Sequence, residues 1–174
     1  MQFDVLTALL ERSGMSQRAL QKKTGYSLGS VNKTLHELGD AGLVDGGAVS
    51  ASGLDALEPY RVKRAVIIAA GFGSRLVPVT LNTPKPLVRV NGKRIIDGIL
   101  DALLAACIED IVIVRGYLSE QFDQLLYKYP MIRFIENPAY NEANNISSAM
   151  CARYLLSEAY VCEADLLISN PAII

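Results

Sequence analysis

The sequence predicts a two-part α/β protein, with short helices and a small hairpin in residues 1–60 and a three-layer α/β/α sandwich in residues 61–174. In the first part, apolar residues recur at helical spacing, as in Phe3, Val5, Leu6, Leu9 and Leu10. In the second part, short β-branched apolar runs alternate with segments of helical spacing, which is typical of parallel strands joined by crossover helices.

The composition is that of an ordinary folded protein. The chain has 174 residues, of which 51% are hydrophobic, and a formal net charge of -1. Its apolar stretches fall far short of the ~20 residues that span a bilayer, and the N-terminus lacks the basic and apolar pattern of a signal peptide. We therefore expect a cytoplasmic protein with no membrane role.

The three cysteines, Cys107, Cys151 and Cys162, are widely spaced within apolar segments. This pattern predicts buried, free thiols rather than disulfides or zinc ligands. A catalytic cysteine is disfavoured, because His36 is the one histidine in the chain that could activate it.

In the first part, Ser16 is placed to cap a second helix, and Gly25-Tyr26 interrupts the helical pattern. A third helix is capped by Ser27 or Ser30. One face of this helix is expected to be buried, through Val31, Leu35 and Leu38.

Residues 43–50, L-V-D-G-G-A-V-S, read as a strand, a glycine turn and a strand. Three helices followed by a hairpin make a winged helix. The order resembles the bacterial winged helix-turn-helix family, in which residues 16–38 would supply the second helix, the turn and the recognition helix.

The charge of this part argues against strong DNA binding, because residues 1–60 hold seven acidic and five basic side chains. A local basic patch remains near the start of the recognition helix, made of Lys22, Lys23, Asn32 and Lys33. Both DNA binding and a protein-contact or regulatory role stay open, and the acidic balance favours the second.

The second part begins after the junction at residues 58–64. Its expected strands are residues 63–69, 110–114, 132–136 and 159–163, and its expected helices are residues 95–106, 118–127 and 146–156. This is a Rossmann-like arrangement, in which ligands bind at the carboxyl ends of the strands. The polar segments at those ends are residues 71–75, 115–117 and 137–138, together with Asp165.

The glycine-rich turn at Gly71-x-Gly73 follows the first strand and offers bare backbone N–H groups to a polyphosphate. Leu76 replaces the third glycine of the dinucleotide fingerprint, and the G-K-[ST] ending of a P-loop is absent. Taken alone, the turn is as well explained by a tight connection after a strand.

Residues 69–97 read A-A-G-F-G-S-R-L-V-P-V-T-L-N-T-P-K-P-L-V-R-V-N-G-K-R-I-I-D. This segment resembles the signature of the nucleotidyltransferases that make nucleotide-activated sugars and cholines, and the resemblance extends over about residues 62–170. It implies that Ala70, Gly71, Gly73 and Ser74 bind the nucleotide. It also implies that Arg75 holds the β- and γ-phosphates and that Lys85 neutralises the attacked α-phosphate.

Two later segments narrow the resemblance. Asn144-Asn145-Ile146 is similar to the N-N-I-x-S stretch of bacterial CTP:phosphocholine cytidylyltransferases, where an amide can read a pyrimidine edge. The same residues can also simply cap the helix that follows. Asp165 ends a strand like the family's metal-binding aspartate and is therefore the candidate ligand for Mg²⁺, with Glu163 less certain.

The resemblance implies an Mg²⁺-dependent transfer of a cytidylyl group from CTP to a phosphomonoester such as phosphocholine. A sugar 1-phosphate is the second candidate acceptor. Two other interpretations remain. The protein is a winged-helix transcription regulator with a nucleotide-sensing domain, or it is an inert remnant of an enzyme. Family catalytic domains are longer than residues 62–174, so we expect a domain that is incomplete at its C-terminus, lacks most of the acceptor pocket and turns over weakly or not at all.

Overall fold

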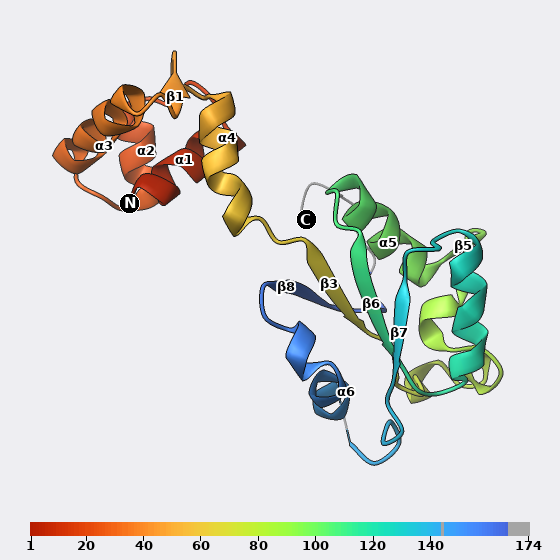
Figure 1. Cartoon of the computed structure of the whole chain (residues 1–174). Helices are drawn as coiled ribbons and strands as arrows, with labels where there is room; N and C mark the ends of the chain where they lie inside the picture. Colours follow the sequence, from red (N-terminus) through yellow and green to blue (C-terminus); the bar gives the residue numbers. More distant parts are fainter. Residues whose placement is uncertain (144, 167–174) are drawn as a thin grey trace. The chain divides into compact units, whose positions relative to one another are not determined.

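The computed structural model describes residues 1–143 and 145–166. The chain divides into two compact units, Met1–Arg61 and a second that begins at Val62 (Figure 1). Across the described ranges, no helix is both long enough and apolar enough to cross a membrane.

The first unit contains the three helices and the hairpin that the sequence predicts. Its elements are α1 Gln2–Glu11, α2 Gln17–Thr24, α3 Leu28–Asp40, β1 Val44–Asp45, β2 Ala48–Val49, α4 Ala51–Leu57 and the 3₁₀ turn η1 Glu58–Tyr60. β1 and β2 are antiparallel, with Val44 opposite Val49. Helix α4 was not predicted, although Ser50 caps it by accepting from the Gly53 N–H at 3.1 Å.

Serine caps position the second and third helices, as expected. Ser16 accepts a hydrogen bond from the Ala19 N–H at the start of α2, and Ser27, rather than Ser30, caps α3. On α3, Val31 and Leu38 are fully buried as predicted. Leu35 is only half-buried, because Thr34 occupies the buried position beside it.

The second unit is built on a parallel sheet. Its strands are β3 Arg64–Ile68, β6 Asp110–Arg115, β7 Arg133–Glu136 and β8 Ala159–Glu163, in the order β7-β6-β3-β8. All three pairings are parallel, and Val66 lies between Val112 of β6 and Val161 of β8. The predicted parallel arrangement is therefore confirmed.

Strand β3 is buried on both faces, which is why its residues are all apolar after Arg64. Ala65 and Ile67 pack on the side of α5 Ile95–Ala105, and Val66 packs on the opposite side with Ala152, just beyond α6 Asn145–Cys151. Helices therefore cover the two faces of the sheet and form the predicted three layers (Figure 1).

Three local expectations differ from the structure. The segment expected to be a helix at residues 118–127 is a series of 3₁₀ turns, η5 Ser119–Tyr127. Helix α6 ends at Cys151 and is followed by a 3₁₀ turn, η6 Arg153–Leu155. A hairpin of β4 Arg89–Val90 and β5 Lys93–Arg94 was not predicted, although its turn, Asn91-Gly92, has the two positive φ angles that this dipeptide favours.

The three cysteines are free thiols, as expected. Burial raises the pKa of the Cys162 thiol, which keeps it protonated at neutral pH. Cys107 is exposed and Cys151 and Cys162 are only half-buried, so the prediction that all three are buried is wrong, most clearly at Cys107. The reason is local: Cys107 has a φ of 58° in the turn after α5, and Ile108 takes the buried position.

Candidate functional site

The glycine-rich turn continues directly from the buried strand β3. The Ala69 N–H donates to the Val114 carbonyl at 2.8 Å, and the Ala70 carbonyl accepts from the Tyr117 N–H at 3.0 Å. These bonds extend the pairing of β3 with β6 beyond the end of β3, so the turn begins at a fixed point at the carboxyl end of the sheet. Ala70 is 2% exposed and serves as its anchor.

Gly73 is required at its position for two reasons. Its φ of 70° lies in the left-handed region, and a Cβ there would approach Lys85 Cβ to 3.1 Å and Thr80 Cγ2 to 3.2 Å. The buried Thr80 hydroxyl also donates to the Gly73 carbonyl at 3.0 Å. The turn and the segment that carries Lys85 are therefore packed as one unit.

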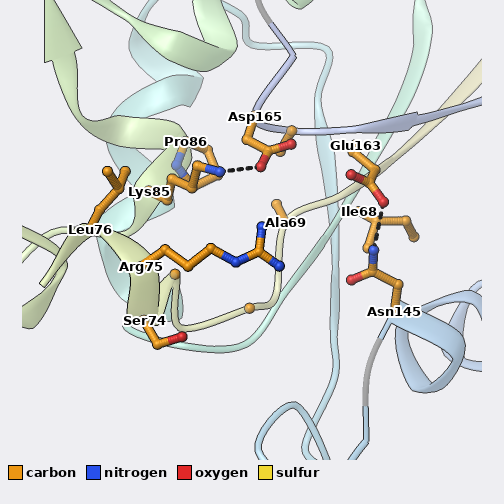
Figure 2. A pocket seen from close by; sticks show the side chains of 13 residues that line it. Ile68, Ala69, Ser74, Arg75, Leu76, Lys85, Pro86, Asn145, Glu163 and Asp165 are labelled. Atoms are coloured by element: carbon orange, nitrogen blue, oxygen red, sulfur yellow. Dashed lines mark hydrogen bonds and ion pairs between the residues drawn. The ribbon is translucent and has the colours of Figure 1, made fainter.

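Lys85 lies in a short 3₁₀ turn, η4 Lys85–Leu87, which buries Pro86 and Leu87. Its ammonium group pairs with the Asp165 carboxylate, which follows the end of β8 (Figure 2). The two side chains come from positions 80 residues apart in the sequence, and each is 32% exposed. Because this ion pair is accessible, the charged groups of a ligand can replace either partner.

Arg75 extends from the η2 turn Ser74–Leu76 toward Ala69 (Figure 2). Arg64 and Arg115 each pair with a carboxylate, whereas Arg75 has no ion pair or hydrogen-bond partner among the residues that the structure describes. Its planar fork of donors is therefore available to an anion.

Two carboxylates lie where β8 ends. The Glu163 carboxylate accepts a hydrogen bond from Asn145 Nδ2 at 2.7 Å, and the Asp165 carboxylate pairs with Lys85 (Figure 2). The Ala164 N–H donates to the Ile68 carbonyl at 3.0 Å, which fixes the backbone between them. Within the described ranges, no group of three histidine, cysteine or acidic side chains is placed to hold a metal.

These side chains surround one cavity of about 380 Å³. It is lined by Ile68, Ala69, Gly71, Gly73, Ser74, Arg75, Leu76, Lys85, Pro86, Asn145, Glu163, Ala164 and Asp165. Of the residues selected from the sequence, Ala70 does not line this cavity, and Asn144 lies outside the described residues. Thr80, which holds the turn, was not selected as a site residue.

The two units of the chain match two different protein families. Residues 64–168 match the Nucleotidyl transferase family. The chain belongs to this family. The match confirms the resemblance drawn from residues 69–97. Residues 1–51 match the MarR family, which confirms the winged-helix interpretation of the first unit.

Two curated relatives of this nucleotidyl transferase family member are cytidylyltransferases. The 2-aminoethylphosphonate cytidylyltransferase of Lancefieldella rimae is 47% identical over 108 residues, which cover 61% of this chain and 44% of the relative. The choline-phosphate cytidylyltransferase of Streptococcus pneumoniae is 45% identical over 102 residues, which cover 59% of this chain and 44% of the relative. This chain therefore spans less than half the length of these relatives.

Solved structures give the same fold. The CTP:phosphocholine cytidylyltransferase of Streptococcus pneumoniae superposes with a TM-score of 0.57 and 41% identity, over 66% of this chain and 51% of that one. A UDP-glucose pyrophosphorylase superposes with a TM-score of 0.51 at 18% identity, over 64% of this chain and 50% of that one. This second likeness shows the fold alone.

Proposed function

We propose that the second unit binds CTP and transfers its cytidylyl group to a phosphomonoester, with release of pyrophosphate. The observation that carries the proposal is the arrangement around one cavity of Arg75, which has no partner among the described residues, and an accessible ion pair, Lys85 with Asp165. An anion with several charges, together with a cation, satisfies all three side chains at once. The relatives named above, which act on 2-aminoethylphosphonate and choline phosphate, support the cytidylyl donor.

The glycine-rich turn binds the nucleotide in this proposal. Backbone N–H groups of Gly71, Gly73 and Ser74 face the phosphates, with Ala70 as the fixed start of the turn, and the Arg75 guanidinium holds the β- and γ-phosphates with paired hydrogen bonds. Asn144 and Asn145 remain the proposed amide contacts to the nucleotide.

The carboxylates of Asp165 and Glu163 fit Mg²⁺, which binds to one or two carboxylates and completes its shell with water and phosphate oxygens. Asp165 is the proposed ligand. When bound, the ion offsets the negative charge of the triphosphate and of the departing pyrophosphate. Lys85, which pairs with Asp165 in this structure, would contact the phosphates of the bound nucleotide.

The reaction needs no covalent intermediate. An oxygen of the acceptor phosphate attacks the α-phosphorus of CTP, the bond from that phosphorus to the bridging oxygen breaks, and pyrophosphate leaves with the electron pair. Lys85 stabilises the charge that develops on the α-phosphate, and the rigid η4 turn holds it there. Positioning and electrostatics therefore supply the catalysis.

Phosphocholine is the favoured acceptor, and a sugar 1-phosphate is the second candidate. The second candidate is supported by the mannose-1-phosphate guanyltransferase of Neurospora crassa, which is 44% identical over 66 residues, or 38% of this chain and 18% of that protein. Pyrophosphate release measured with CTP and each acceptor in turn separates the two.

Titration calorimetry tests the binding step. We expect the chain to bind CTP and tripolyphosphate in the presence of Mg²⁺, and Arg75→Ala to weaken both by about 10-fold or more, because it removes hydrogen bonds between charged groups. Arg18→Ala is the matched control, since it removes an exposed arginine in the first unit. An Arg75→Ala variant that binds both ligands like the wild type would contradict the proposal.

For Met1–Arg61 we propose a protein-contact or regulatory role rather than tight DNA binding. In the basic patch, Lys23 pairs with Glu11, and Lys33 lies 3.8 Å from Glu37. These carboxylates offset the charge that phosphate contacts need.

A mobility-shift titration tests this role. We expect no salt-sensitive binding of random DNA at micromolar protein, because Lys23 and Lys33 each have a carboxylate partner. A gain of such binding is expected when Glu11 and Glu37 are both replaced by glutamine. Strong wild-type binding that disappears as salt rises would instead identify the first unit as a DNA-binding domain.

A further inference from the structure

Asn137 is a buried polar residue that does not line the phosphate cavity. It directly follows β7, and only 2% of its surface is exposed. Its backbone N–H donates to the Arg115 carbonyl at 2.8 Å, which fixes it beside the end of β6. The residue therefore lies at the carboxyl end of the sheet, although the proposed reaction gives it no role.

The side chain of Asn137 is engaged inside the protein at both of its polar atoms. Oδ1 accepts a hydrogen bond from the Ala139 N–H at 3.0 Å, which turns the chain just beyond Pro138. Nδ2 donates to the hydroxyls of Ser147 and Ser148, both at 3.0 Å. A carboxamide has two N–H donors, so these two bonds use both of them. The side chain thus joins the end of β7 to α6.

The bonds from Asn137 reach the first turn of α6, where the helix buries no apolar side chain. Asn145 and Ile146 are exposed, and Ser148 is the one buried residue of the helix. The other end is held differently, because Ala152, just beyond the helix, packs in an apolar cluster on that face of the sheet. Polar bonds, rather than apolar packing, therefore locate the start of α6.

Asn145 is the first residue of α6 and lines the phosphate cavity. Its Nδ2 donates to the Glu163 carboxylate at the end of β8, at 2.7 Å (Figure 2). Ser147 and Ser148 belong to the same helical turn, so a shift of these serines moves Asn145 with them. Hydrogen bonds thus connect Asn137, outside the cavity, to a side chain that lines it.

We propose that Asn137 is a positioning residue of the nucleotide site, which fixes the first turn of α6 and thereby holds Asn145 where it contacts the nucleotide. This inference rests on the proposed function, which assigns that contact to Asn145. A contact residue that is fixed before the ligand arrives costs less entropy on binding. Without the bonds from Asn137, Asn145 keeps its bond to Glu163 but lies on a turn that is no longer tied to β7.

A purely structural role for Asn137 is the alternative, because the loss of buried hydrogen bonds destabilises any fold. The two roles differ in how the loss of Asn137 combines with the loss of Asn145. Residues that act through one network have non-additive effects, whereas independent residues have additive ones. If Asn137 acts through Asn145, its replacement costs no further CTP affinity once Asn145 is already alanine.

Titration calorimetry of the wild type, Asn137→Ala, Asn145→Ala and the double variant measures this coupling. Each single replacement should weaken CTP binding by about 10-fold, and the double replacement also by about 10-fold rather than about 100-fold. Tripolyphosphate, whose binding is assigned to the glycine-rich turn and Arg75, should bind equally to all four proteins. Asn137→Ala should lower the midpoint of urea denaturation in both backgrounds, because the buried Ser148 hydroxyl loses its partner.

Tyr129→Phe is the control for a structural effect. Tyr129 is 1% exposed, and its hydroxyl donates to Asp101 at 2.8 Å, outside the cavity. This variant should lower the urea midpoint and bind CTP like the wild type.

A second variant keeps the test decisive if Asn137→Ala does not fold. Replacing Ser147 and Ser148 together with alanine breaks the same bonds from the helix side. It should weaken CTP binding by about 10-fold, and by no more when Asn145 is also replaced.

Three results would overturn the inference and leave nucleotide binding in place. They are an additive loss of about 100-fold in the double variant, an unchanged CTP affinity in Asn137→Ala, and an unchanged CTP affinity in Asn145→Ala. In the last case Asn137 has no contact to position. If the wild type binds neither CTP nor tripolyphosphate, the proposed function itself fails.

Discussion

Replacing Lys85 with methionine is expected to lower the single-turnover rate of pyrophosphate release by about 100-fold or more, because it removes the positive charge that offsets developing charge on the α-phosphate. Methionine keeps the apolar stem that packs beside the turn. The Lys85–Asp165 pair is partly exposed, so its loss should change the free energy of unfolding by no more than about 1 kcal/mol.

The control is Lys93→Met, which makes the same substitution at an exposed lysine of the β4–β5 hairpin. Quenched-flow measurement of pyrophosphate, together with urea denaturation of both variants, separates a catalytic effect from a structural one. Near wild-type turnover in the Lys85→Met variant would refute the assignment of Lys85.

The sheet could be predicted from the sequence because buried parallel strands leave a strong local pattern. Strand β3 is an uninterrupted apolar run after Arg64, and β8 occupies the expected residues 159–163. The rule that ligands bind at the carboxyl ends of parallel strands then brings together Arg75 and Asp165, which line one cavity in the structure.

The contacts that complete the site have no local pattern. Lys85 and Asp165 are 80 residues apart, and the bond from Thr80 to Gly73 depends on how the turn folds back. The ring contacts among Phe72, Tyr117 and Tyr140 have no local pattern either, because the three residues follow three different strands. Such side chains resemble ordinary core or surface residues until the fold places them together.

Local errors in the prediction have local causes. The η5 segment has the apolar spacing of a helix, but Leu118 precedes it with a φ of 46°, and the chain continues in 3₁₀ turns. Apolar spacing alone does not distinguish these two helix types over short segments, since both place residues three apart on one side.

Gly73→Ala is expected to abolish detectable binding of CTP and tripolyphosphate and to lower the free energy of unfolding by about 2 kcal/mol. The left-handed φ of 70° alone costs roughly 1–2 kcal/mol for a residue with a Cβ. The added Cβ also meets Lys85 Cβ at 3.1 Å and Thr80 Cγ2 at 3.2 Å, so the turn and the lysine must move apart.

Gly92→Ala separates these two effects. Gly92 has a φ of 83°, so alanine is strained there as well, but a Cβ would meet no heavy atom within 4 Å. It should therefore lose a similar free energy of unfolding and keep nucleotide binding, as measured by urea denaturation and titration calorimetry. Equal binding in the two variants would mean that the packing of Gly73 against Lys85 and Thr80 does not form the phosphate site.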